Sequence, residues 1–359
     1  VCGYPAGAPC PGEEQWHGIH IRRIGGKDQS RQGMGARLWA YFTFLVGVLR
    51  ILQATGPGTI VVACTNPPLL PIVVSLLSRF RGRYHLILQD LYPEGLEISG
   101  LLRSRGIAAT VWRWLNRKAY ARARTITVLG RDMQAHLVRE YGLSGEKVRW
   151  IPHWSPAGET PPLSFAQSRL TTRLGLEKKW VVQYSGNMGL WHDLETAVRA
   201  AEILRNEPDI HFLFAGGGRR REGAERLSER LGLRNVTWIN AVPLENLDDL
   251  LACSHAALIS QREGLAGIAV PCKLYGILAS GRPVLAAVPG ESETALVVRE
   301  EKCGEVLPPH EPEALADCIR RWFRDPTQSG EMGQRARRAY EQKYTLDRAV
   351  ERFRELWQI

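Results

Sequence analysis

Short apolar runs rich in Val, Ile and Leu alternate with longer helical stretches along most of the chain. The runs predicted as strands are 17–24, 59–64, 84–89, 125–129 and 148–151, then 180–184, 211–215, 236–239, 256–260, 283–287 and 306–307. The stretches predicted as helices are 36–54, 71–81, 107–123 and 130–141, then 194–206, 223–231, 247–253, 273–280, 312–324, 330–343 and 347–357. This alternation favours parallel sheets with helices on both faces.

The pattern stops once, at residues 155–170, which are rich in Pro and Ser and lack periodicity. We therefore expect an N-terminal α/β domain over residues 1–155, a linker over 156–171 and a second α/β domain over 172–344. Residues 345–359 are expected to form a helix that could pack back on the first domain. Two doubly wound halves of this kind bind ligands outside the carboxyl ends of their strands, in a cleft where they face each other.

Charge is divided unevenly between the halves of a chain whose formal net charge is +10. Residues 1–150 contain 20 Lys and Arg against 9 Asp and Glu, and the remainder contains 27 against 28. A basic first half indicates an anionic partner such as a membrane surface, a nucleic acid or a phosphorylated substrate. The basic residues are interleaved with Trp and Leu on predicted helices, and no RNA- or DNA-binding motif occurs, so nucleic acid ranks last.

The segment 38–49, LWAYFTFLVGVL, is apolar on nearly every side and lies between Arg37 and Arg50. It is shorter than the ~18 residues that a membrane-spanning helix needs. A buried helix explains the segment. A helix resting in a membrane interface, with its aromatic and arginine side chains at the headgroups, explains it as well.

The seven cysteines are widely spaced, odd in number and without a CxxC pair. This pattern favours reduced thiols in a cytoplasm over a disulfide framework or a zinc site. No His, Cys and Asp cluster has the spacing of metal ligands, and no DxD stretch occurs, so we expect no metal site.

Three glycine-rich segments of the second half follow predicted strands: YSGNMG at 184–189, AGGG at 215–218 and AGIAVPCKLYGILASGRP at 266–283. Glycine lets the backbone approach a ligand, and N–H groups that open a helix bind anions. The candidate ligands of a phosphate or sugar are Gly186, Asn187, Gly189, Gly216, Gly217 and Gly218. Plain tight turns are the alternative, and the run Arg219–Arg221 is also typical of a solvated face.

Lys273 stands at the start of the helix predicted over 273–280. A lysine is unfavourable at a helix N-terminus unless an anion is near. Facing a diphosphate, it would stabilise the charge that develops on a leaving nucleotide. A solvated lysine is the alternative.

Polar side chains also follow several strands directly. Asp90 and Glu94 come after the run 84–89, where a carboxylate could orient an acceptor hydroxyl, accept its proton, or merely cap a helix. Residues 261–263, Gln-Arg-Glu, end the run 256–260 and could reach sugar hydroxyls or form a surface loop.

Two motifs, YSGNMG at 184–189 and PCKLYGILASGRPV at 271–284, resemble those of the retaining, nucleotide-sugar-dependent glycosyltransferases of the GT-B fold. The chain looks most like the bacterial branch that builds capsule, O-antigen and exopolysaccharide, the L-fucosamine-transferase-like group. Further support comes from TNPPL at 65–69, QDLYPE at 89–94, KVRWIPHW at 147–154 and AGGG at 215–218. The resemblance covers nearly the whole chain and rests on the order and spacing of these motifs together.

The resemblance implies two Rossmann-like domains facing across a cleft, the first for the acceptor and the second for the donor. It implies that Asp90 and Lys273 are catalytic. The implied donor-binding residues are Gly186, Asn187, Gly189, Gly216, Gly217, Gly218, Gln261, Glu263, Lys273, Leu274 and Tyr275, and the implied acceptor-binding residues are Asn66, Asp90 and Glu94. Members of the family also have a first strand, a Gly-rich loop and a helix before the point at which this sequence begins.

Two departures from the family pattern stand out. The second glutamate of the family's pair, expected to hold the ribose, falls on Gly276, and Glu263 lies at the wrong distance from the helix to be the first. The basic pair often found after the first strand of the second half is also missing, and Asn187 and His192 stand there instead. For His192, as for His153, structural hydrogen bonding explains a single histidine better than base catalysis does.

Together these features predict a metal-independent transferase that moves a hexosyl or N-acetylhexosaminyl group. Its donor would be a nucleotide-sugar, UDP-linked, acting as a substrate with no cofactor, and its acceptor a lipid-linked or polysaccharide glycan of the bacterial surface. The enzyme would be cytoplasmic and bound peripherally to the anionic inner face of the plasma membrane, with no nucleic acid partner. Two alternatives remain open. One is an enzyme like UDP-N-acetylglucosamine 2-epimerase, which would need more cleft carboxylates, and the other is a non-catalytic binding subunit of the same fold.

Overall fold

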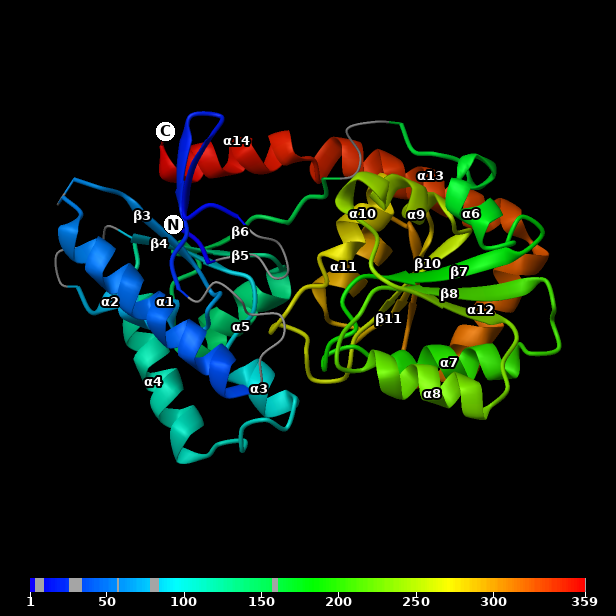
Figure 1. The fold of residues 1–359 in the computed structure, drawn as a ribbon, viewed down its shortest axis with the longest axis horizontal. Helices are drawn as coiled ribbons and strands as arrows, with labels where there is room; N and C mark the ends of the chain where they lie inside the picture. The colour runs from blue at the N-terminus through cyan, green and yellow to red at the C-terminus, as the bar shows by residue number, and fades with distance from the viewer. Residues whose placement is uncertain (4–9, 26–33, 57, 78–83, 157–160, 359) are drawn as a thin grey trace. The chain divides into compact units, whose positions relative to one another are not determined.

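The computed structural model describes residues 1–3, 10–25, 34–56, 58–77, 84–156 and 161–358. The chain divides into two compact units, each built from a parallel sheet and helices (Figure 1). The first unit consists of Val1–Pro93, Arg105–Val128 and Leu137–Arg149, and the second of Glu94–Ser104, Leu129–His136 and Trp150–Ile359.

The first unit contains a four-stranded sheet in the order β3-β4-β5-β6. Its strands are β3 (Val61–Cys64), β4 (Tyr84–Leu88), β5 (Thr125–Val128) and β6 (Val148–Trp150). The β3–β4 and β4–β5 pairs are parallel, as the short β-branched runs predict. Burial is complete along the centre of this sheet, where Leu86, Leu88 and Ile126 are fully enclosed.

The first unit also contains α1 (Met34–Ala54), which precedes this sheet in the chain, and α2 (Leu70–Ser75), α4 (Ile107–Arg122) and α5 (Arg131–Tyr141), the last of which begins in the second unit. The described side chains of α1 have two different faces. Ala40, Phe44 and Leu52 are buried, whereas Trp39 is 66% exposed and Phe42 is 56% exposed. The helix is therefore not buried on every side, and an aromatic face remains in solvent.

The second unit contains a six-stranded sheet in the order β12-β11-β10-β7-β8-β9, with every neighbouring pair parallel. Its strands are β7 (Trp180–Ser185), β8 (Ile210–Ala215), β9 (Val236–Ile239), β10 (Ala256–Ser260), β11 (Val284–Ala287) and β12 (Gly304–Leu307). The order starts in the middle of the sheet and reverses beside β7. This reversal is the doubly wound arrangement, and it places a ligand crevice at the carboxyl ends of β7 and β10.

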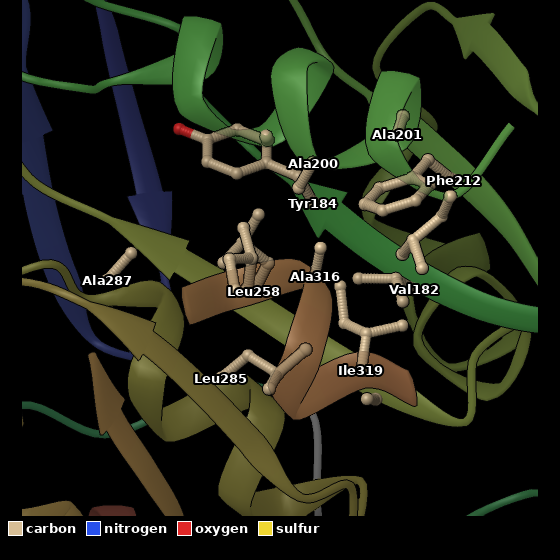
Figure 2. Packing of buried hydrophobic residues seen from close by; sticks show 14 of the residues in the cluster. Val182, Tyr184, Ala200, Ala201, Phe212, Leu258, Leu285, Ala287, Ala316 and Ile319 are labelled. Carbon is tan, nitrogen blue, oxygen red and sulfur yellow. The ribbon is translucent and has the colours of Figure 1, made fainter. Parts of the chain in front are cut away.

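Helices of the second unit are α3 (Glu94–Ile98), α6 (Arg169–Arg173), α7 (Leu194–Ile203), α8 (Arg221–Arg230), α9 (Leu247–Ala252), α10 (Lys273–Ala279), α11 (Glu293–Glu300), α12 (Pro312–Arg324), α13 (Pro326–Lys343) and α14 (Leu346–Trp357). Two hydrophobic clusters cover opposite faces of the sheet. Because side chains alternate along each strand, Leu258 packs in the cluster with α7 and α12, and its neighbour Ile259 packs in the cluster with α10, α11 and α13. Figure 2 shows the first of these clusters, in which Leu258 lies between Tyr184 and Leu285.

Most expected elements occur within a few residues of their predicted bounds, but three expectations need correction and two helices were not expected. The strand expected over 17–24 is an antiparallel hairpin of β1 (Glu13–Trp16) and β2 (Ile19–Arg22). The helix expected over 71–81 covers only Leu70–Ser75, and residues 78–81 lie outside the described part of the chain.

Helices α3 and α11 were not expected at all. Part of the segment 156–171, expected to be a plain linker, is helical and packs on the second unit. In it, Phe165–Gln167 forms a 3₁₀ turn, α6 follows, and the Ser168 hydroxyl donates to the carbonyl of Asp249 at 3.0 Å. Residues 157–160 lie outside the described chain.

Candidate functional site

A cavity of about 320 Å³ opens in the second unit, where the Gly-rich turns after β7 and β8 meet the start of α10. The lining residues are His153, Trp154, Ser155, Pro156, Ser185, Gly186, Ala215, Gly216, Ala241, Val242, Leu247, Leu250, Leu251, Cys272, Lys273 and Gly276. Apolar side chains from α9 and from the connection that precedes it form one wall. The turn residues and Lys273 supply the polar part, so the cavity is apolar at one side and cationic at the other.

The ammonium group of Lys273 is buried in this cavity, and its Nζ has no hydrogen-bond partner among the described residues. It lies 3.6 Å from the centre of the Tyr184 ring, which gives it a cation–π contact. Burial lowers the pKa of Lys273 to about 7. A buried, unpaired cation is costly unless an anion enters beside it, so the arrangement favours an anionic ligand.

The two Gly-rich turns interlock because glycine allows their backbones to touch. Gly216 has φ +135°, and a Cβ there would lie 2.1 Å from the carbonyl oxygen of Gly186. Gly218 has φ +143°, and a Cβ there would lie 2.5 Å from the carbonyl of Met188. Arg221 ties the same turn by donating to the carbonyl of Gly216 at 2.6 Å. These glycines therefore build the floor beneath Lys273, whose Nζ is 3.8 Å from the Cβ position of Gly186.

His192 is the second polar group beside Lys273. Its Nδ1 is 3.0 Å from the carbonyl oxygen of Ser260, and since a carbonyl only accepts, Nδ1 carries the proton and Nε2 is left as an acceptor. Burial, and then the charge of Lys273, lower the pKa of His192 to about 4. This histidine is therefore neutral at physiological pH and adds no second positive charge.

The loop that leads into α10 is fastened at both ends by side chains. The Asp132 carboxylate accepts from the N–H of Gly267 at 2.8 Å and from the N–H of Glu293 at 3.0 Å. The Gln261 amide donates to the carbonyl of Ala269 at 2.9 Å. These hydrogen bonds hold the loop in one position, and the loop in turn places Lys273 at the cavity.

The structure brings Gly186, Gly216 and Lys273 together in the cavity and places the other predicted donor residues around it. Asn187, Gly189, Gly217 and Gly218 belong to the two turns but are not among its lining residues. Leu274 and Tyr275 are fully buried in the core behind α10. Gln261 is buried as part of the fastened loop, and Glu263 is exposed.

The predicted acceptor residues follow the sheet of the first unit or open α3. Asp90 comes directly after β4, and burial raises the pKa of its carboxyl to about 6. The Thr65 hydroxyl accepts from the N–H of Gln89 at 3.0 Å and thereby joins the ends of β3 and β4. Asn66 is exposed, whereas Glu94 is the first residue of α3 in the second unit and is buried. Of these residues, Asp90 has the pKa that suits proton transfer, because about 6 is close to neutral pH.

Sequence reasoning missed the ordinary apolar and supporting residues that line the cavity or hold its loops in place. The cavity wall of Val242, Leu250 and Leu251 follows β9 and carries only ordinary core side chains. Asp132 is a helix-start carboxylate in sequence and a loop fastener in the structure. No local signal distinguishes such residues, because their role arises from tertiary packing alone.

Two searches of the described residues give negative findings. No group of three or more His, Cys, Asp and Glu side chains in this part of the chain could hold a metal ion. Among the helices described, none is long and apolar enough to cross a bilayer.

The fold and the site place the chain in a known class of protein. Residues 169–339 match the family model of glycosyl transferases group 1, and residues 1–154 match that of the glycosyl transferase 4-like domain. A Pseudomonas aeruginosa protein described as "Probable glycosyltransferase WbjE" is 28% identical over 79% of this chain and 70% of its own length.

Solved structures agree on the fold. Sucrose-phosphate synthase of Thermosynechococcus elongatus superposes with a TM-score of 0.78 at 18% identity, over 99% of this chain and 87% of that one. HepE of Anabaena, in complex with UDP and glucose, has a TM-score of 0.71 at 15% identity, over 91% and 83% of the two chains. The architecture is thus the GT-B fold of two Rossmann-like halves, and the class is glycosyltransferase. The second half of the chain matches the group 1 glycosyltransferase family, and the first half matches the glycosyl transferase 4-like domain.

Proposed function

We propose that the cavity of the second unit binds a UDP-sugar through its diphosphate. The observation that carries the proposal is the buried Lys273 ammonium, which lacks a partner among the described residues and lines the cavity. A diphosphate would neutralise this cation, and the apolar wall of Val242, Leu250 and Leu251 would receive the nucleoside. HepE, whose structure was solved with UDP and glucose, supports a uridine nucleotide as the first candidate.

The chemistry that we propose is retaining transfer of a hexosyl or N-acetylhexosaminyl group without a metal or cofactor. The bond between the anomeric carbon and the diphosphate breaks, and the acceptor oxygen forms the new bond on the same face. Lys273 stabilises the negative charge that grows on the departing diphosphate. A neutral His192, with Nε2 as an acceptor, would position a hydroxyl of the donor.

For the acceptor, we propose that Asp90 removes the proton of the attacking hydroxyl. Its raised pKa, about 6, makes it a stronger base than an ordinary carboxylate while leaving most of it ionised at pH 7. Asn66 and Glu94 would contact the same acceptor, as the family resemblance implies.

We further propose that the acceptor is a lipid-linked or polysaccharide glycan of the bacterial surface, met at the inner face of the plasma membrane. Exposed Trp39 and Phe42 stack on one face of α1, with ring centres 5.6 Å apart. On α4, Trp114 is 52% exposed, and the Lys118 ammonium lies 3.4 Å from its ring centre. Exposed aromatic rings beside cations suit an anionic interface.

A thermal-shift titration tests the donor site most simply. UDP, GDP and ADP are added to the wild type, to Lys273→Ala and to Lys178→Ala, a matched change of an exposed lysine. A ligand that binds only the folded protein raises its stability. We expect UDP to stabilise the wild type and Lys178→Ala, and Lys273→Ala to lose that shift. Stabilisation of all three proteins alike would contradict the site.

A further inference from the structure

The wall of the cavity beside Lys273 contains a glycine where a side chain would reach the ligand. Gly276 lies three residues after Lys273 in α10, so the two positions share one face of the helix, about 4.5 Å apart along its axis. A Cβ at position 276 would stand 3.4 Å from the Ser155 hydroxyl and 3.7 Å from Leu251 Cδ1. Ser155, Leu251 and Gly276 all line the cavity. The position therefore faces the ligand and offers it no group.

If the donor diphosphate binds Lys273 as proposed, the ribose is the part of the nucleotide that lies at Gly276. A diphosphate that pairs with the Lys273 ammonium is joined directly to the ribose. The ribose must then continue along the cavity, and the next position on the same face of α10 is Gly276. The apolar wall beyond it, which includes Leu251 and Val242, receives the base.

A ribose is usually recognised by a carboxylate that accepts from its 2′-hydroxyl. None of the described residues that line the cavity is an Asp or a Glu. The Ser155 hydroxyl is near, and one hydroxyl can serve the 3′-hydroxyl, which ribose and 2′-deoxyribose share. A site that hydrogen-bonds a hydroxyl of its substrate rejects the analogue that lacks this hydroxyl strongly. A site without such a hydrogen bond rejects the analogue only weakly.

We infer that this site does not select ribose over 2′-deoxyribose, so that dUDP, the 2′-deoxy form of uridine diphosphate, enters it as readily as uridine diphosphate does. This inference rests on the proposed donor site and makes Gly276 the residue that sets its specificity. The substrate class thereby widens from UDP-sugars to include their 2′-deoxy forms.

Titration calorimetry with UDP and dUDP, which differ only at the 2′ position, tests the inference. We expect the two dissociation constants of the wild type to agree within about threefold. We expect Gly276→Glu and Gly276→Gln, which supply an acceptor, to prefer UDP by about tenfold or more. Gly276→Ala adds only the Cβ and should leave the ratio near one. Circular dichroism confirms that each variant is folded.

Different results would contradict the lack of ribose selection and the proposed donor site. Binding of UDP with a loss of about tenfold or more for dUDP in the wild type would overturn the inference and leave the donor site intact. Failure of the folded wild type to bind UDP, dUDP, GDP or ADP would overturn the donor site itself, and the inference with it.

Discussion

The two units differ in whether their notable cationic side chains are exposed or buried. The first half of the chain is strongly basic, and in the first unit described cations such as Arg50 and Lys118 lie exposed beside exposed aromatic rings. The second half is nearly neutral, yet it contains Lys273, whose buried ammonium has no hydrogen-bond partner among the described residues. Net charge therefore indicates a surface that meets an anion broadly, whereas a single desolvated cation indicates a site that binds one anion specifically.

The two sheets differ in how far the residues of their edge strands are exposed. The edge strands β9 and β12 of the second sheet contain no exposed residue, whereas β3, at the edge of the first sheet, exposes Val62. The more enclosed unit can hold an ammonium group out of water. We expect the more open unit to contact the large acceptor or surface.

The largest effect is expected from Asp90→Asn in the first unit. We expect kcat of transfer to fall about 1,000-fold, since an amide cannot accept the proton, while UDP affinity stays within about twofold. In the wild type, kcat should fall tenfold per pH unit below about pH 6, where the Asp90 carboxyl becomes protonated. Initial rates against pH measure both. An unchanged kcat in Asp90→Asn would show that the first unit supplies no base at this position.

A large effect on stability is expected from Gly216→Ala in the second unit. The new Cβ would collide with the carbonyl of Gly186 at a residue whose φ is +135°, so we expect a loss of about 3 kcal/mol in the free energy of unfolding. Gly217→Ala is the matched control, because nothing lies within 4 Å of its Cβ position. Urea unfolding compares the two. Equal stabilities would show that the turns do not interlock as described.

The pH dependence of donor affinity is expected to be smaller and to belong to the second unit alone. Burial lowers the pKa of Lys273 to about 7, so the free site loses its charge as the pH rises above 7. Binding a diphosphate raises that pKa and takes up a proton. Affinity should therefore fall by up to tenfold per pH unit above pH 7.

Calorimetry at several pH values measures this dependence. Lys273→Arg, which stays charged throughout, should bind with an affinity that is flat over the same range. A wild-type affinity that does not change between pH 7 and 9 would contradict the lowered pKa.

The smallest effect is expected at the surface of the first unit. Trp39→Ser with Phe42→Ser should weaken binding to anionic phospholipid vesicles about fivefold to tenfold, because two exposed rings are removed from α1. Flotation with phosphatidylglycerol vesicles measures the loss. Ile203→Ser with Leu244→Ser, two exposed apolar residues of the second unit, is the control and should bind as the wild type does.

Much of the fold could be predicted because the apolar runs have clear periods. Strands such as 236–239 and 256–260 have the predicted bounds, and Lys273 was singled out by its place at a helix start. The hairpin of β1 and β2 was missed in part because Glu13–Trp16, EEQW, has no apolar run. Helix α11 was missed although Ser292 caps it by accepting from the N–H of Ala295.

The site was less predictable than the fold. Gly216 and Gly218 were expected to approach a ligand, whereas the structure shows that they allow two backbone turns to touch, a need that only the packed structure reveals. The burial of Lys273 depends on Tyr184, which stands 89 positions earlier in the sequence. Contacts between distant segments leave no local pattern from which they could be derived.

Titration calorimetry of UDP into the wild type and into Lys273→Met at pH 7 measures whether the buried ammonium group holds the donor. Methionine keeps the length of the side chain and removes its charge. We expect measurable binding to the wild type and a loss of about a hundredfold or more in Lys273→Met, which should also unfold at higher urea because a buried charge is gone. Equal UDP affinity in the two proteins would contradict a donor site built around this buried cation.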